Sequence, residues 1–157
     1  MNRRALGIAI CGLLLPALAF AQQKTSKASA AGLPNKALMQ KIWDGWSTLN
    51  PANTEQFYAK GSHVFYDVAP LKYASWDEYA AGVKKEFGGY KSAKFEVNDD
   101  AQIHPAGEYY WGTATVKSDM TSGTGKREMS TFRWTVLWHK QDGKWLIVHE
   151  HVSAPLQ

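Results

Sequence analysis

Cysteine is nearly absent from this chain, since Cys11 is the only one among its 157 residues. It lies within an apolar run near the N-terminus that has the features of an export signal. Once that segment is removed, the chain has no thiol. The lack of cysteine excludes disulfide bridges, a cysteine nucleophile and thiolate metal sites from the remaining protein.

Several common functional motifs are also missing. The sequence has no glycine-rich phosphate-binding loop and no motif around a serine nucleophile. Its 18 lysine and arginine residues are interspersed with 14 aspartate and glutamate residues, and the formal net charge is +4. A nucleic-acid-binding surface needs clustered basic residues. We therefore expect no nucleic-acid partner, and nothing in the sequence indicates a cofactor.

The first 21 residues have the pattern of a signal peptide. Arg3 and Arg4 give a positive start, residues 5–20 are apolar, and a small-x-small cleavage site ends at Ala21. The apolar run is too short for a retained membrane span. We predict a secreted, periplasmic protein with no membrane attachment after cleavage. A twin-arginine export signal is the less favoured alternative.

Removing 21 of the 157 residues leaves 136, which suits one domain with one core. Residues 22–32 are rich in lysine, serine and alanine and contain no large apolar side chain, so we predict a flexible tether there. Residues 33–157 then form the folded domain.

The first half of this domain has helical patterns. Apolar residues recur at helical spacing over residues 34–49, which predicts a first helix. Residues 53–56 resemble a capping box that opens a short helix, and residues 63–67 are strand-like. A second capping box, Ser75 to Glu78, begins a further helix that ends at Gly88-Gly89.

The second half has strand patterns. We expect strands over residues 94–104 and 109–120 and a long hairpin over residues 132–153. Asp142-Gly143 lies between the two arms of the hairpin, and this dipeptide favours a tight turn because glycine accepts a positive φ. Helices followed by antiparallel strands predict an α+β fold with the helices on one face of a curved sheet.

Both faces of the predicted hairpin are apolar. Strict alternation places Val148, Glu150 and Val152 on one face of the second arm, and Ile147, His149 and His151 with Trp145 on the other. One face must meet the helices and the other a partner. A bulge would reverse this parity, so Glu150 is either a buried carboxyl or a solvent-facing one.

The C-terminal residues resemble a known family. The run from Trp138 to Ser153, with Asp142-Gly143-Lys144-Trp145 and His149-x-His151 within it, is similar to the end of the association domain of calcium/calmodulin-dependent protein kinase II. That domain belongs to the nuclear transport factor 2-like superfamily, which includes SnoaL-like cyclases and ketosteroid isomerase. The resemblance implies a cone-shaped α+β fold with a pocket under the helices and a homodimer through the outer sheet face.

The resemblance also assigns site residues. Positions that carry pocket arginines in the kinase domain fall on Val116, Val136 and Val152, which implies an apolar pocket. The general base of the isomerase falls on Asp67, at the end of the first strand. The two donors of its oxyanion hole fall on residues without the required groups, so the implied catalytic machinery is incomplete.

Asp67 and the pair formed by His149 and His151 each have two interpretations. Asp67 is either a base whose pKa burial raises or an aspartate that caps the turn before Pro70. His149 and His151 lie on one face of a strand, but a zinc site needs a third protein ligand. Because the resemblance implies a structural role for this pair, we predict no metal site.

These observations lead to three functional hypotheses. We favour a domain that binds a small apolar molecule over an isomerase, cyclase or dehydratase with Asp67 as its base. The third is a self-associating scaffold. The expected pocket residues are Trp43, Trp46, Tyr66, Asp67, Val116, Trp134, Val136, Val148, Glu150 and Val152.

Overall fold

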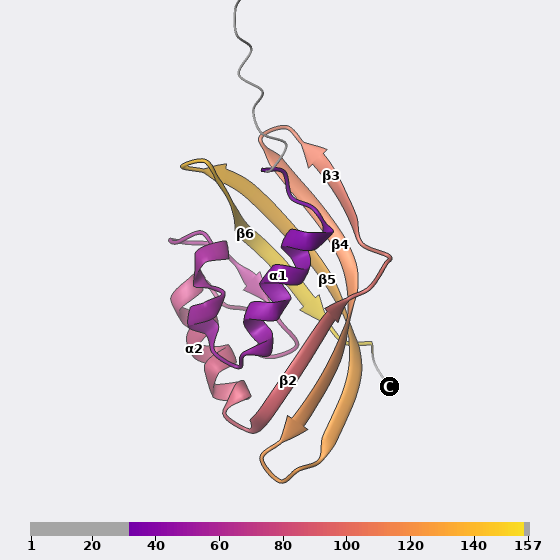
Figure 1. Ribbon diagram of the computed structural model, residues 1–157. Helices are drawn as coiled ribbons and strands as arrows, with labels where there is room; N and C mark the ends of the chain where they lie inside the picture. The colour runs from indigo at the N-terminus through magenta and orange to yellow at the C-terminus, as the bar shows by residue number, and fades with distance from the viewer. Residues whose placement is uncertain (1–31, 156–157) are drawn as a thin grey trace, which may run out of the picture.

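A computed structural model describes residues 32–155 of the chain (Figure 1). The predicted signal peptide, and all of the predicted tether but its last residue, lie outside the described residues. Two α-helices lie on the concave face of one strongly curved sheet, which confirms the predicted α+β cone. None of the helices in residues 32–155 is long and apolar enough to cross a membrane.

The first helix, α1 (Lys36–Ser47), begins where Asn35 caps it. The Asn35 side chain accepts a hydrogen bond from the backbone N–H of Leu38 at 2.9 Å, which satisfies one of the free donors at a helix start. The helix buries one apolar stripe against the sheet, formed by Met39, Ile42, Trp43 and Trp46. The periodicity of the sequence therefore identified both this helix and its buried face.

The predicted short helix is instead two 3₁₀ turns, η1 (Pro51–Asn53) and η2 (Glu55–Phe57). The predicted capping box over residues 53–56 does not form. Asn53 is the last residue of η1, and its side-chain amide donates to Thr48 Oγ1 at 2.9 Å. Thr54, which precedes η2, makes no side-chain capping bond. Asn50 caps the first turn by accepting from the backbone N–H of Ala52 at 3.2 Å. The short strand β1 (Phe65–Tyr66) follows, and Asp67 comes directly after it.

The second helix, α2 (Trp76–Phe87), starts at the predicted capping box. Ser75 accepts from the N–H of Glu78, and the Glu78 carboxylate accepts from the N–H of Ala74 at 2.8 Å. Helix α2 buries Trp76, Tyr79 and Val83, so its inner face is set by the same 3.6-residue periodicity as that of α1.

Five longer strands complete the sheet: β2 (Tyr90–Val97), β3 (Gln102–Ala106), β4 (Tyr109–Ser122), β5 (Arg127–Gln141) and β6 (Lys144–Ser153). The order is β1-β6-β5-β4-β2, and β3 also pairs with β4. The single strand expected over residues 94–104 is thus two strands, which occupy different ends of the same edge of β4. Strand β1 joins β6 in parallel, while the other pairs are antiparallel.

The β5–β6 hairpin forms at the predicted turn and contains a bulge. Asp142 and Gly143 both have positive φ values, 48° and 78°, as a two-residue type I′ turn requires. Leu137 pairs with His149, but Trp138 pairs with Ile147, so β6 carries an extra residue, Val148. The bulge reverses the side-chain parity of β6 at that point.

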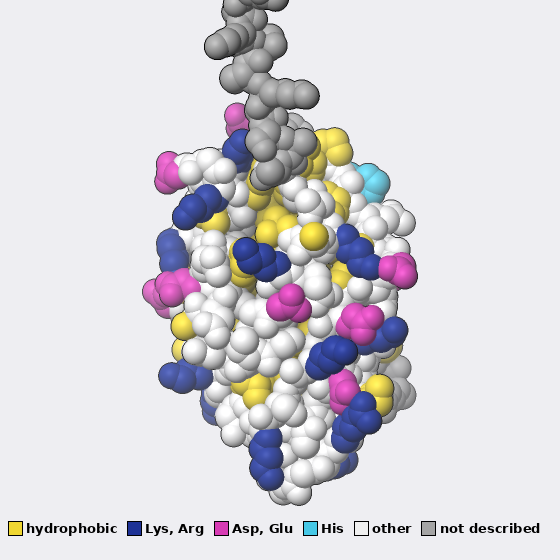
Figure 2. Space-filling model, in the orientation of Figure 1, with side chains coloured by type: hydrophobic (Ala, Val, Ile, Leu, Met, Phe, Trp, Pro, Cys, Tyr) yellow, Lys and Arg dark blue, Asp and Glu magenta, His cyan; other side chains and the backbone are white. Residues whose placement is uncertain are grey.

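The bulge corrects the predicted faces of β6. Ile147, expected on the outer face with the histidines, is fully buried in the core. Val148, expected on the inner face, is only half-buried, while Glu150 and Val152 remain on the inner face. Figure 2 shows lysine, arginine and acidic side chains scattered together over the helical side of the molecule, with no large patch of one sign.

Candidate ligand pocket

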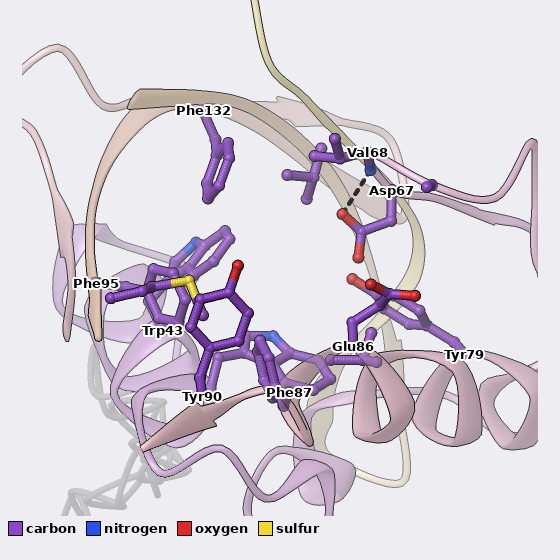
Figure 3. A pocket seen from close by; sticks show the side chains of 14 residues that line it. Trp43, Asp67, Val68, Tyr79, Glu86, Phe87, Tyr90, Phe95 and Phe132 are labelled. Atoms are coloured by element: carbon purple, nitrogen blue, oxygen red, sulfur yellow. Dashed lines mark hydrogen bonds between the residues drawn. The ribbon is translucent and has the colours of Figure 1, made fainter. Parts of the chain in front are cut away.

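A pocket of about 230 Å³ lies between the two helices and the adjoining ends of the strands (Figure 3). Residues from α1, α2, β2, β4, β5, β6 and the segment after β1 line it. They are Trp43, Trp46, Asp67, Val68, Ala69, Tyr79, Val83, Glu86, Phe87, Tyr90, Phe95, Met120, Phe132 and Val152. Seven of the fourteen are aromatic, and the volume lies just below the range of about 300–1,000 Å³ that is typical of ligand sites.

Helix α2 supplies one wall of this pocket. Tyr79, Val83 and Phe87 are four residues apart and Glu86 is three residues after Val83, so they share one face of the helix. Trp43 and Trp46, three residues apart on α1, form the adjoining wall. The pocket therefore depends on how the two helices are placed on the sheet.

The two acidic residues lie on one side of the pocket, and most of the aromatic residues lie on the other. Figure 3 shows Asp67, Tyr79 and Glu86 grouped together on one side, while Trp43, Phe95 and Phe132 lie on the other. A bound molecule would therefore meet an apolar wall at one end and carboxyl and hydroxyl groups at the other.

The structure brings four of the predicted pocket residues together: Trp43, Trp46, Asp67 and Val152. Tyr66 lies elsewhere, because the next residue along a strand points to the opposite face. Its ring is partly exposed and packs against His149 and His151, with centroids 5.5 and 5.6 Å away. Tyr66 belongs to the outer face of the sheet.

The deeper hollow expected beneath Val116 and Val136 is filled by side chains. Both valines point inward and are fully buried, but neither lines the pocket. Trp134 and Trp138 are also fully buried, and the Trp134 ring packs edge-on against Trp43 with centroids 5.5 Å apart. Because these indole rings fill the deeper hollow, the open pocket lies nearer to the ends of α2 and β2.

Asp67 is half-buried at the edge of the pocket. Its Oδ1 accepts a hydrogen bond from the backbone N–H of the next residue, Val68, at 2.7 Å. Burial raises the pKa of Asp67, and the nearby Glu86 carboxylate adds to the rise. The Val68 N–H and the Tyr79 side chain act in the opposite direction. Asp67 is therefore a half-buried carboxyl with a raised pKa and with one oxygen bonded to the backbone.

Glu150 is a buried carboxyl, which settles the alternatives left by its strand parity. It is 1% exposed. Its Oε1 accepts from the Tyr58 hydroxyl and its Oε2 from Nε1 of Trp134, both at 2.9 Å. Trp46 Nε1 in turn donates to the Tyr58 oxygen at 3.1 Å. Both oxygens of Glu150 therefore have donors, as a buried carboxyl requires.

Burial also determines the ionisation of Glu150. Removal from water raises its pKa to about 7, although the nearby Tyr79 hydroxyl and the hydrogen bonds from Trp134 and Tyr58 favour the ionised form. Glu150 does not line the pocket itself.

Tyr79 connects the buried carboxyl to the pocket. Its side chain acts on the ionisation of both Asp67 and Glu150. Burial raises the pKa of the Tyr79 hydroxyl well above its usual value, so this group stays protonated and can donate. Asp67, Tyr79 and Glu150 thus form a polar series that leads from the pocket into the core.

Sequence reasoning missed most of the α2 and β2 contribution to the site. Tyr79, Val83 and Phe87 recur at helical spacing within the segment predicted as the second helix, so their inward direction was detectable from the sequence. Nothing in the sequence indicated that Glu86 lies near Asp67, because the two residues belong to separate elements that only the tertiary fold brings together.

The histidine pair lies on the outer side of the sheet, away from the pocket. His149 is half-buried, with Nδ1 2.7 Å from the backbone oxygen of Val64, and His151 is exposed. Residues 32–155 contain no group of three histidine, cysteine or acidic side chains placed to hold a metal ion.

Comparison with known proteins identifies the family. The SnoaL-like domain family matches residues 36–157, so the chain belongs to this family. Together with the fold, this match places the protein in the nuclear transport factor 2-like superfamily. No curated protein sequence matches significantly.

Solved structures support the same fold. A proposed calcium/calmodulin dependent protein kinase II association domain from Xanthomonas campestris is 22% identical, with 78% of this chain and 86% of that chain covered and a TM-score of 0.67. A nuclear transport factor 2-like protein from Salmonella enterica is 17% identical, with coverage of 78% and 92% and a TM-score of 0.68.

A third similar structure is a proposed scytalone dehydratase from Novosphingobium aromaticivorans. It is 8% identical, with 77% of this chain and 81% of that chain covered and a TM-score of 0.68. At these identities the similarity shows the shared fold, and the activity must be argued from this chain's own pocket.

Proposed function

We propose that this SnoaL-like domain binds a small, largely apolar molecule in the pocket between α1, α2 and the sheet. The observation that carries the proposal is the lining of the 230 Å³ cavity, in which seven aromatic side chains accompany a few grouped polar side chains. Apolar walls with a small number of convergent polar groups are typical of ligand sites. The aromatic wall would bind the body of the ligand, and Asp67 and Tyr79 would orient its polar end.

A matched pair of methionine substitutions tests this proposal. Met120 lines the pocket, whereas Met129 is 72% exposed. Met120→Trp should fill the cavity and weaken binding of a neutral fluorescent probe, N-phenyl-1-naphthylamine, by about tenfold or more. Met129→Trp should leave the affinity unchanged. Equal affinities for the wild type and both variants would place the probe outside the pocket and contradict the proposal.

A second candidate function is acid–base catalysis at the same site. It is favoured by the raised pKa of Asp67 and by the Tyr79 hydroxyl beside it, which could orient or polarise a substrate oxygen. Proteins from Novosphingobium aromaticivorans and Streptomyces avermitilis with the same fold are proposed dehydratases. Asp67→Asn should then abolish turnover of a neutral bound compound while retaining its binding. Unchanged turnover would remove Asp67 from the mechanism.

The outer face of the sheet supports self-association. Tyr109 and Trp111 are each 39% exposed, and they stack on His139 and His104 with ring centroids 4.6 Å apart. Aromatic side chains are enriched at protein interfaces. Similar structures include association domains, among them that of the Caenorhabditis elegans kinase. We include a homodimer through this face in the proposal.

The proposed cellular location is argued from the sequence and not from the fold. The signal-peptide pattern of residues 1–21 supports export to the periplasm. The proposal is therefore a periplasmic domain that encounters its ligand after secretion. N-terminal sequencing of the protein from periplasmic extracts should give Gln22 as the first residue. A protein retained in the cytoplasm with Met1 in place would contradict this part of the proposal.

A further inference from the structure

The charged residues of the pocket all have one sign. Asp67 and Glu86 are the charged lining residues, and no lysine, arginine or histidine accompanies them. This is notable because the chain as a whole carries more basic than acidic residues, 18 against 14. The pocket is thus an acidic site within a basic protein.

The two pocket carboxylates have no cationic partner among the described residues. Four ion pairs occur in residues 32–155, and they join Lys36 to Asp99, Lys60 to Glu55, Lys126 to Glu128 and Arg127 to Asp119. The groups that act on the ionisation of Asp67 are the Val68 N–H, Tyr79 and Glu86, none of which is a cation. Glu86 is a like charge, so a cation placed between the two carboxylates would relieve their repulsion.

The opposite side of the pocket suits the body of an organic cation. Tyr90, Phe95, Phe132 and Trp43 lie across from the carboxylates in Figure 3. Aromatic rings bind the hydrocarbon next to an ammonium group by apolar contact. A free anion would meet repulsion from Asp67 and Glu86 without any compensating basic side chain.

We infer that the pocket selects a small organic cation, an ammonium group on an aromatic or aliphatic body, over neutral and anionic molecules of the same shape. The ammonium group lies between Asp67 and Glu86, and the apolar body lies against Phe95 and Phe132. This inference rests on the proposed function, since it concerns the polar end of the ligand that the pocket binds.

The expected geometry uses oxygens that the fold leaves available. Asp67 Oδ1 already accepts from the backbone of Val68, and Figure 3 shows the second oxygen pointing toward Tyr79 and Glu86, where we place the ammonium group. Glu86 is exposed at the pocket edge. Water screens an exposed carboxylate more than a half-buried one. Asp67 should therefore contribute more to the selection of a cation than Glu86.

Three probes that share one ring system test the inference. They are 2-(naphthalen-2-yl)ethylamine, 2-(naphthalen-2-yl)ethanol and naphthalen-2-ylacetate, which are cationic, neutral and anionic at pH 7. Isothermal titration calorimetry at low salt should show the amine binding about tenfold more tightly than the alcohol, and the acetate binding most weakly. Raising the salt concentration to about 0.5 M should narrow the difference, because screening weakens charge pairing.

Charge-neutralising variants complete the test. Asp67→Asn should weaken amine binding by about tenfold and Glu86→Gln by about threefold, while alcohol binding changes less than twofold. Glu108→Gln is the matched control, because Glu108 is exposed in the β3–β4 turn and is not a lining residue. It should change neither affinity.

The outcomes separate this inference from the proposed function. If the alcohol binds as tightly as the amine, or the acetate binds best, selection for a cation is wrong while binding in the pocket stands. Loss of amine binding that is equal in Asp67→Asn and Glu108→Gln would also overturn it. If none of the probes binds wild-type protein with a normal melting transition, the proposed function itself is contradicted.

Discussion

The Trp134 indole donates from Nε1 to Oε2 of Glu150 at 2.9 Å, inside a core that water does not reach. The Tyr58 hydroxyl donates to the other oxygen of the same carboxyl at the same distance. These two hydrogen bonds join strand β5 and the segment after η2 to strand β6. A buried carboxyl at this place therefore links the sheet to the helical layer.

Removing the Glu150 carboxyl should be strongly destabilising. Glu150→Ala leaves the Tyr58 hydroxyl and the Trp134 indole without an acceptor and creates a cavity. We expect a loss of at least about 3 kcal/mol in the free energy of unfolding, measured by urea denaturation at pH 6. Glu108→Gln, on an exposed turn, should change it by less than about 0.5 kcal/mol. Equal stability of Glu150→Ala and wild type would contradict the described network.

The ionisation of Glu150 predicts how stability depends on pH. Burial raises its folded-state pKa to about 7, above the ordinary value of 4.5. Below pH 4.5 the group is protonated in both states. Between pH 4.5 and 7 the folded state retains a proton that the unfolded state has lost, so stability falls as the pH rises.

The size of this change in stability follows from the folded-state pKa of Glu150, about 7, and its ordinary value of 4.5. At ~1.4 kcal/mol for each pKa unit, the raised pKa of Glu150 lowers the free energy of unfolding by roughly 3 kcal/mol by pH 8. Urea denaturation of the wild type and of Glu150→Gln between pH 5 and 8 measures it. The difference between the two proteins should shift in favour of Glu150→Gln as the pH increases. A pH-independent difference would show that Glu150 has an ordinary pKa in the folded state.

The ionised Asp67 carboxylate should lower the free energy of unfolding of the protein. Burial and the Glu86 carboxylate both raise its pKa, so its negative charge is unfavourable in the folded protein at neutral pH. Asp67→Asn retains an oxygen that can accept from the Val68 N–H. We expect this variant to be more stable by on the order of 0.5–1 kcal/mol at pH 7.

A matched substitution controls for general charge effects. The Asp99 carboxylate pairs with Lys36, which lowers the pKa of Asp99. Asp99→Asn should therefore not raise the melting temperature. If Asp67→Asn lowers the melting temperature by more than Asp99→Asn does, then Asp67 has a stabilising role that outweighs its burial.

The exposed aromatic side chains on the outer sheet face lead us to predict a dimer. If Trp111 lies in a dimer interface, Trp111→Glu should place a charge there and produce monomers at micromolar concentration in sedimentation velocity experiments. The wild type should sediment as a dimer under the same conditions. Glu55→Gln, a substitution at an exposed residue next to the helical layer, should leave the dimer intact. A wild-type monomer at micromolar concentration would contradict self-association through this face.

The elements that depend on local signals were predictable from the sequence. The cap at Ser75, the turn at Asp142-Gly143 and the apolar stripes of both helices each depend on residues close together in the chain. The family resemblance added the position of Asp67 after the first strand. The local signals were enough to identify an α+β fold with helices on a curved sheet, and the resemblance identified the cone and one carboxylate of the pocket.

The exact shape of the pocket was not predictable in the same way. The bulge at Val148 arises from the pairing of two strands, and no glycine or other local feature marks it. The filling of the deep hollow by Trp134 and Trp138 depends on contacts between strands and helices. Both features follow from tertiary packing, which strand alternation alone does not specify.

The central claim is that a ligand lies between α1, α2 and the sheet, and indole resonances can locate it. Trp43 and Trp46 line the pocket, whereas Trp111 lies on the outer sheet face. In ¹H–¹⁵N spectra assigned by single Trp→Phe variants, titration with 2-(naphthalen-2-yl)ethanol should shift the Nε1–H signals of Trp43 and Trp46 and leave that of Trp111 unchanged. Shifts confined to Trp111, or none at a saturating probe concentration, would contradict the account.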